Sequence, residues 1–316
     1  MTPSVDLADL HARQRKAVLH FAKEPRTFEE RGIVTSVFDR EFASCWVLLS
    51  ELARLGVTAP IEAFHLPGEL SNEYAALLPS LGLNLRLRTL HDQTNAFGVK
   101  VWSIWRSSFR EVLWLDSDNF PIRDPTFLFD DAEFRAKGSL FWRDVSGADR
   151  ARYWHEGSNV WPIFNVPAND AEEFESGQLL IDKERRWAEI ALTLHFVSIA
   201  IYRRCVLGEK DMFRLAWQNL ATARKKSPPV IGYLRDPALV PYGFMPFGPF
   251  HKGLPNDSHK WGGGTVMVQR DRDGRALFNH RNLKKFRIGQ NSFNADIENE
   301  NFYHAHVERL RELLAG

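Results

Sequence analysis

Apolar runs alternate with amphipathic stretches along the first third of the chain. Runs suited to buried strands occur at residues 32–38, 60–64, 83–87 and 111–115. Apolar positions at helical spacing predict helices at residues 5–23, 41–55, 71–78 and 99–109. Strands that alternate with helices are joined by right-handed crossovers and form parallel sheets. The pattern therefore predicts an α/β domain with a mostly parallel central sheet flanked by helices.

Beyond residue 125 the pattern is mixed. It predicts strands at 138–142 and 174–181, and helices at 148–155, 183–202, 208–220 and 300–314. Residues 226–264 are rich in Pro and Gly and predict loops with short strands, and 265–269 and 275–278 predict a hairpin. We expect a helical extension at 1–29, one domain with an elaborated C-terminal half at 30–295, and a C-terminal helix at 296–316 packed on that domain.

Composition excludes several classes of protein. The chain has 41 basic and 40 acidic side chains, so it lacks the basic excess of a nucleic-acid binder. No apolar run reaches the roughly 20 residues of a membrane span, and the N-terminus lacks the apolar core of a secretory signal. Cys45 and Cys205 stand outside any Cys-x-x-Cys pattern, which favours reduced, buried thiols. We expect a cytoplasmic protein without an integral membrane segment.

Two carboxylates mark the end of the run at 111–115. Asp116 and Asp118 lie one residue apart, so in an extended chain their side chains project to the same side. Ligands bind at the carboxyl ends of strands in open α/β sheets, and paired carboxylates suit Mn²⁺ or Mg²⁺. A solvated turn is the structural alternative. The second such pair, Asp271 and Asp273, precedes Gly274 and predicts only a hairpin turn.

Basic residues near these acids suggest a diphosphate site. His280 follows the last predicted strand and could complete the coordination of Mn²⁺. Arg281, Lys284 and Lys285 could attract phosphate, and Lys100 opens the helix before the strand at 111–115. A solvated basic loop and an ordinary surface lysine are the structural alternatives.

Polar residues downstream could contact sugars. Glu175 and Gln178 begin a predicted strand, and Gly177 between them would let a ligand approach the backbone. Asp211 could orient a hydroxyl group, or it could be only a first-turn acid favoured by the helix dipole. The glycine-rich segment 261–264 could form a lid beside a cleft, or a loop without a role in binding.

Three blocks together resemble the family of fungal Golgi α-1,2- and α-1,3-mannosyltransferases, which build mannan and branch N-glycans. The blocks are Lys100 to Pro125, which contains Leu-Asp-Ser-Asp-Asn; 175–183, which begins Glu-Ser-Gly-Gln; and 208–213, followed much later by His280. The resemblance covers roughly residues 30–290, and the order of the blocks is more specific than any single block.

The resemblance implies a GT-A glycosyltransferase fold, Rossmann-like, with a nucleotide-sugar donor, a Mn²⁺-type metal (or Mg²⁺) and retention of anomeric configuration. It implies that Asp116 and Asp118 hold the metal and donor, that His280 supplies a further metal ligand, and that Thr35 and Ser36 line the nucleotide pocket. The expected reaction moves mannose from GDP-mannose onto a glycan acceptor.

Several alternatives remain open at this point. A UDP-glucose or UDP-galactose transferase of surface glycan or lipooligosaccharide synthesis would differ only in the base and sugar pockets. A non-catalytic carbohydrate-binding protein would have the transferase fold without the transferase activity. Glu175 and Asp211 are the two candidates for a carboxylate beneath the anomeric carbon. The fungal enzymes carry a membrane anchor and this sequence shows none, so we expect at most a peripheral membrane contact through a lipid-linked acceptor.

Overall fold

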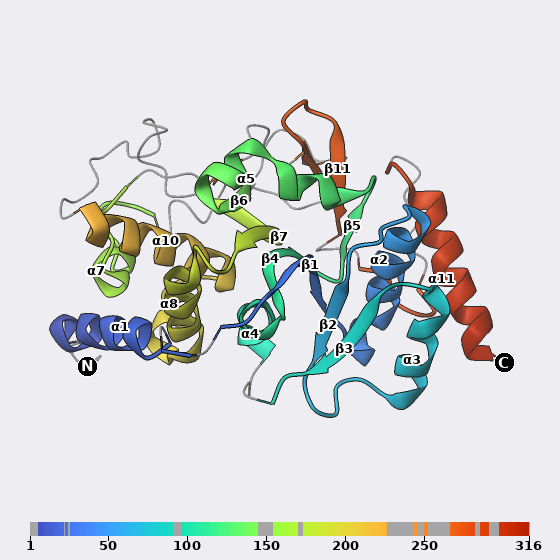
Figure 1. The fold of residues 1–316 in the computed structure, drawn as a ribbon, viewed down its shortest axis with the longest axis horizontal. Coiled ribbons are helices and arrows are strands. Elements are labelled where there is room, and N and C mark those ends of the chain that lie inside the picture. Colours follow the sequence, from blue (N-terminus) through green and yellow to red (C-terminus); the bar gives the residue numbers. More distant parts are fainter. Residues whose placement is uncertain are drawn as a thin grey trace.

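A computed structural model describes residues 6–21, 23–24, 26–91, 96–144, 154–169, 173–225, 243–244, 250–251, 266–281, 285–290 and 297–315 of the 316-residue chain. Helices flank a central sheet on both faces (Figure 1). Together with its largely parallel strands, this arrangement confirms the predicted α/β fold class.

The central sheet has the strand order β3-β2-β1-β4-β7-β6-β8. Its strands are β1 (Glu29–Ser36), β2 (Ile61–His65), β3 (Leu85–Thr89), β4 (Phe109–Leu115), β6 (Ser139–Arg143), β7 (Phe174–Asp182) and β8 (Gly243–Phe244). The first four strands pair in parallel. By contrast, β7 runs antiparallel to both β4 and β6. The start of β7 therefore meets the end of β4.

A smaller antiparallel sheet has the order β5-β11-β10-β9. It consists of β5 (Asn119–Pro121), β9 (Phe250–His251), β10 (Met267–Arg270) and β11 (Ala276–His280). Because β5 follows β4 after a turn of three residues, this sheet begins at the carboxyl end of β4. The sequence pattern did not predict β5, which is too short to show a period of its own.

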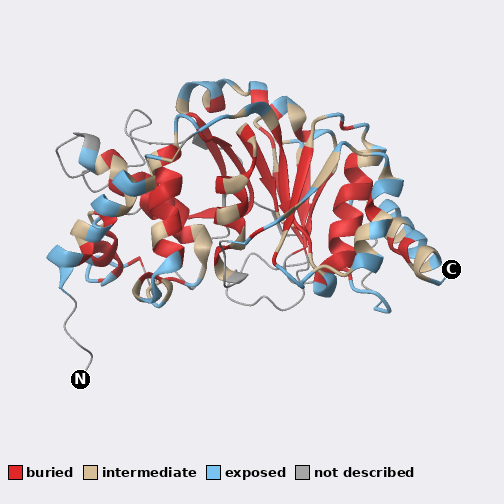
Figure 2. Ribbon diagram, turned by 60° about the horizontal axis from the view of Figure 1, so that its bottom comes forward, coloured by how far each residue is buried: buried red, intermediate tan, exposed pale blue. Residues whose placement is uncertain are grey.

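Alternate residues of β4 face two different cores. Val112 and Trp114 pack with one cluster, to which α4 (Val99–Arg106), α8 (Trp187–Ser198) and α10 (Glu209–Lys225) contribute. Leu113 and Leu115 pack with a second cluster, to which α2 (Phe42–Arg54) and α11 (Glu300–Ala315) contribute. Because side chains alternate along a strand, covering both faces of β4 buries all four residues of the apolar run from Val112 to Leu115. Figure 2 shows the buried strands between partly exposed helices.

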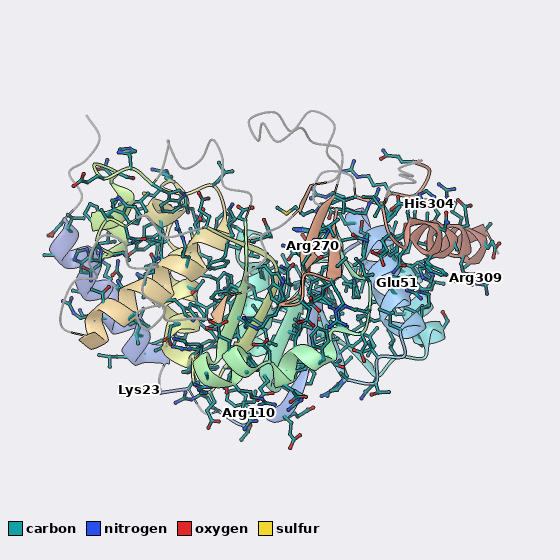
Figure 3. All side chains as sticks on the ribbon, turned by 90° about the horizontal axis from the view of Figure 1, so that it is seen from above. Lys23, Glu51, Arg110, Arg270, His304 and Arg309 are labelled. Carbon is teal, nitrogen blue, oxygen red and sulfur yellow. The ribbon has the colours of Figure 1, made fainter. Side chains whose placement is uncertain are left out.

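The first and last helices pack on opposite sides of the molecule. The N-terminal helix α1 (Leu7–Phe21) lies against α8, and α11 lies against α2 (Figure 1). Figure 3 shows Glu51 of α2 beside α11, which carries His304 and Arg309. The buried carboxylate of Glu51 lies 2.7 Å from His306 Nε2, which links the two helices. The predicted limits of the domain, residues 30 and 295, stay predictions.

Most predicted elements are present, with shifted ends. The helix predicted at 183–202 is two helices, α8 and α9 (Ala200–Arg203), because Ile199 between them is extended, with φ −108° and ψ 126°. The helix expected to reach residue 109 ends at Arg106, and β4 begins at Phe109. Three further α-helices are short: α3 (Asn72–Leu77), α5 (Ala132–Lys137) and α7 (Val160–Phe164). Most of the predicted 148–155 helix and 226–264 loops lie outside the described residues.

Within the described part of the chain, every helix is too short or too polar to cross a membrane.

Candidate active site

Three segments that are distant in sequence meet at the carboxyl end of β4. The backbone N–H of Asp116 donates to the carbonyl of Gly177 at 2.8 Å, which extends the β4–β7 pairing by one residue. The N–H of Arg281 donates to the carbonyl of Asp118 at 2.8 Å, next to the β5–β11 pairing of Asn119 with His280. Backbone hydrogen bonds therefore hold the segments around both acids in place.

Asp116, Asp118 and His280 form the one cluster of potential metal ligands found among the described residues. Each offers a ligand atom, and these atoms lie within 4.8 Å of one another. His280 Nε2 is 3.4 Å from Asp118 Oδ1, and His280 Nδ1 is 3.9 Å from Glu175 Oε1. Two carboxylates and an imidazole suit Mn²⁺, which accepts both oxygen and nitrogen ligands. The residues present therefore fit the expected cation.

The electrostatics of the cluster are those of a buried charged site. Burial acts against the imidazolium, yet the carboxylate of Asp118 raises the pKa of His280 to about 9. Burial likewise acts against ionised Asp118, but His280 and Lys285 together lower the pKa of Asp118 below its usual range. The ionised carboxylate of Asp118 is thus stabilised by His280 and Lys285, whereas burial raises the pKa of Asp116 against the attraction of Lys100.

Gly177 makes room for a side chain of the protein, whereas its sequence position suggested room for a ligand. A Cβ at this residue would lie 2.6 Å from His280 Cε1 and 2.6 Å from His280 Nδ1. The space beside the backbone is therefore taken by the imidazole of His280. The glycine admits a side chain of the protein where a ligand was expected.

Lys100 is buried behind Asp116. Its Nζ lies 3.0 Å from Asp116 Oδ1, 2.9 Å from Glu209 Oε1 and 2.8 Å from Ser176 Oγ. Although burial alone would lower it, the two carboxylates raise the pKa of Lys100 above its usual range. Trp114 Nε1 donates a second hydrogen bond to Asp116 Oδ1 at 2.7 Å. The lysine predicted to reach a diphosphate is bonded to oxygens of the protein.

The basic residues after β11 differ in their surroundings. Lys285 Nζ is 3.0 Å from Asp118 Oδ2 and 2.6 Å from Glu41 Oε2. Arg281 is fully buried, and its Nη1 donates to both carboxylate oxygens of Glu300, at 2.8 and 2.6 Å. The structure thus places Lys285 at the acids and Arg281 in the interior. Lys284 lies outside the described residues, as does the segment 261–264.

A cavity of about 580 Å³ opens beside the acids. Asp116 and Asp118 lie on its wall together with Ser36, whereas Thr35 is fully buried. The complete lining is Ser36, Phe38, Asp39, Arg40, Glu41, Gly68, Glu69, Phe97, Val99, Lys100, Trp114, Asp116, Ser117, Asp118, Glu209 and Lys285. A space of this size accommodates a ligand as large as a nucleotide sugar, by comparison with typical ligand pockets.

The remaining predicted site residues are buried outside the cavity lining. Glu175 Oε1 accepts hydrogen bonds from the N–H groups of Ser176 at 2.9 Å and Gly177 at 3.2 Å, and burial raises the pKa of Glu175 to about 7. Gln178 is fully buried and accepts a hydrogen bond from Asn119 Nδ2 at 2.6 Å.

Asp211 is also buried, with 3% of its surface exposed. Its Oδ1 lies 4.0 Å from Arg214 Nη2, and burial raises the pKa of Asp211 to about 6. The contacts of Asp211 in this structure are therefore with protein groups. Glu209, two residues earlier, does line the cavity. The sequence pattern indicates the block at 208–213, but it contains no signal that separates Glu209 from Asp211.

The second pair of acids closes a turn, as predicted. Asp271 Oδ1 accepts hydrogen bonds from the N–H groups of Asp273 at 3.0 Å and Arg275 at 2.9 Å, between β10 and β11. Gly274 has φ +78°, the left-handed conformation that glycine adopts without strain.

Comparison with known proteins gives concordant matches. A model of the mannosyltransferase family matches residues 30–156. The chain's curated relatives are fungal α-mannosyltransferases. The α-1,2-mannosyltransferase MNN24 of Candida albicans is 28% identical over 153 residues, which are 38% of this chain and 22% of the relative. The α-1,2-mannosyltransferase MNN2 of Saccharomyces cerevisiae is 24% identical over 60% of this chain and 39% of its own length. The resemblance read from the sequence is thereby confirmed.

These matches span only part of the relatives, between 22% and 39% of the two proteins named above. Among solved structures, the glycosyltransferase GlyE of Streptococcus pneumoniae is 17% identical, with a TM-score of 0.43 over 59% of this chain and 43% of its own. The galactosyltransferase LgtC is 16% identical, with a TM-score of 0.43 over 58% of this chain and 69% of its own.

Proposed function

We propose that the protein is a metal-dependent, retaining glycosyltransferase that moves mannose from GDP-mannose onto a glycan acceptor. The observation that carries the proposal is the cluster of Asp116, Asp118 and His280, whose two acids lie on the wall of a cavity of about 580 Å³. Mannose is the favoured sugar because the curated relatives are named mannosyltransferases.

Asp116, Asp118 and His280 would hold Mn²⁺. A bound divalent cation supplies Lewis-acid stabilisation of the negative charge that develops on a leaving diphosphate. The protein itself supplies the geometry. Lys285 keeps Asp118 ionised and in place, and Trp114 with Lys100 orients Asp116. Fixed groups of this kind lower the barrier without reorganising during the reaction.

In the transfer step, the bond between the anomeric carbon and the diphosphate oxygen breaks and a bond to the acceptor oxygen forms. Retention favours attack from the face of the leaving group, with the departing diphosphate taking the proton of the acceptor hydroxyl. A double displacement would need a free carboxylate at the anomeric carbon. Glu175 and Asp211, the two candidates, are both buried and neither lines the cavity, and their contacts with protein groups favour the single step.

A donor screen tests the proposal. Purified protein is supplied in turn with GDP-mannose, UDP-glucose and UDP-galactose, in Mn²⁺, Mg²⁺ or EDTA, and release of the nucleoside diphosphate is measured with and without glycan acceptors. We expect release from GDP-mannose that needs the cation and is lost in Asp118→Asn. If only a UDP-sugar is turned over, the donor is that UDP-sugar and not GDP-mannose. Binding of glycans without turnover of any donor would favour the carbohydrate-binding alternative.

A further inference from the structure

The ammonium group of Lys100 joins two carboxylates that both face the cavity. Asp116 and Glu209 each keep 25% of the side chain exposed, whereas Lys100 keeps 8%. Two oxygens of Ser176, the carbonyl at 2.9 Å and Oγ at 2.8 Å, surround the same ammonium. An ammonium has three hydrogens, so these four groups use its full capacity. A diphosphate oxygen could bind Lys100 only by displacing one of them.

This arrangement joins three separate parts of the fold. Lys100 belongs to the first turn of α4, Asp116 follows β4, and Glu209 is the first residue of α10. The two helices are fixed in the same apolar cluster, α4 through Val101 and α10 through Met212. The position of Glu209 relative to Asp116 is therefore set by packing.

We propose that Glu209 is a positioning residue of the cation site, which acts on Asp116 through Lys100. This inference rests on the proposed function, because it assumes that Asp116 binds a cation. Lys100 on its own would neutralise Asp116 and so weaken its attraction for a divalent cation. Glu209 shares the ammonium and offsets its charge, so that Asp116 stays oriented by Lys100 and remains an effective anionic ligand. In metal sites generally, residues that hold a ligand in place affect metal affinity strongly.

The test compares Mn²⁺ affinity in four forms of the protein without donor: wild type, Glu209→Gln, Lys100→Met and the double variant. Affinity is measured with Mn²⁺ alone by electron paramagnetic resonance of the free ion. Glutamine keeps the shape of Glu209 and removes its charge. We expect Glu209→Gln to weaken Mn²⁺ binding by about 10-fold to 100-fold, the range typical of residues that hold a metal ligand.

The double variant separates an effect through Lys100 from a direct one. If Glu209 acts through Lys100, adding Glu209→Gln to Lys100→Met should change Mn²⁺ affinity by less than about twofold, the usual scatter of independent substitutions. The same loss in both backgrounds would overturn the inference, because Glu209 would then act on the cation directly. An unchanged affinity in Glu209→Gln would overturn it as well.

Matched controls keep the result interpretable. Glu69→Gln removes another carboxylate from the cavity wall and should leave Mn²⁺ affinity unchanged. Lys100→Gln replaces Lys100→Met if the latter does not give the wild-type circular dichroism spectrum. Wild-type protein that binds no Mn²⁺ would remove the cation from the proposed function and this inference with it. If the wild type binds Mn²⁺ and Glu209→Gln binds it with the same affinity, only the inference about Glu209 is overturned.

Discussion

The imidazole of His280 lies against the backbone of Gly177, so closely that a Cβ there would come within 2.6 Å of two ring atoms. Gly177→Ala should therefore push the ring away from Asp118. Because residue 177 lies in a strand and has no positive φ, alanine itself fits the local backbone. We expect loss of Mn²⁺ binding in a protein that still folds, measured by Mn²⁺ titration and circular dichroism. Gly157→Ala is the control, since its nearest neighbour is His155 at 3.7 Å. Normal Mn²⁺ affinity in Gly177→Ala would show that His280 does not bind the cation.

The two Asp-x-Asp pairs should respond differently to the same substitution. Asp118→Asn removes a charged ligand of the proposed cation, so Mn²⁺ binding and donor turnover should both fall below detection. Asp271→Asn should leave Mn²⁺ affinity unchanged, because the described partners of Asp271 are the hairpin turn and Arg123. It should lower the free energy of unfolding by about 1–2 kcal/mol through the weakened turn and ion pair. A loss of Mn²⁺ affinity in both variants would count against the assignment of the site.

Asp211→Asn should change how stability depends on pH. Burial raises the pKa of Asp211 to about 6, against the attraction of Arg214 and Lys210 and with the help of Glu173 and Asp144. A carboxyl with a raised pKa holds its proton in the folded state between about pH 4 and pH 6, where the unfolded chain has released it.

Relative to the Asn variant, the wild-type protein should thus lose stability as pH rises from about 4 to about 6, by about 2–3 kcal/mol, and change little above that. Urea unfolding of both proteins across this range measures the difference. A constant difference would show that Asp211 is not proton-linked to folding.

Glu300→Ala tests whether Arg281 is a structural residue. Arg281 is fully buried and Glu300 accepts two hydrogen bonds from it, so removing the carboxylate leaves a buried charge. We expect the free energy of unfolding to fall by about 3–5 kcal/mol, the usual effect of breaking a buried ion pair. Mn²⁺ affinity, measured below the unfolding transition, should remain. If Arg281 instead contacts the donor, the variant should unfold normally and bind GDP-mannose differently.

The sequence predicted the end of β4 well because an apolar run stops abruptly at two acids. It could not predict the direction of β7. A strand buried on both faces has no alternation of polar and apolar residues, so its composition carries no information about orientation or register. Thus the block beginning at Glu175 was correctly placed near the acids, but its contacts were not.

The contacts of individual charges were the least predictable part of the site. Lys100 and Arg281 looked alike as cations near a diphosphate, yet Lys100 pairs with Asp116 and Glu209, and Arg281 pairs with Glu300. These partners lie 16 residues or more away in the sequence, and only tertiary packing brings them together. The cytoplasmic location and the glycan acceptor stay predictions.

The pairing of β7 with β4 has a consequence for how the chain reaches its native state. All nine residues of β7 are buried, and a slip of one residue would turn every side chain of the strand to the opposite face of the sheet. It would also bring Ser176 or Gln178 beneath the imidazole of His280, where a Cβ does not fit. A slipped chain could not assemble the three ligands. Only molecules in which β7 is correctly aligned with β4 would therefore bind the cation. Mn²⁺ added during refolding should stabilise these molecules and so increase their proportion.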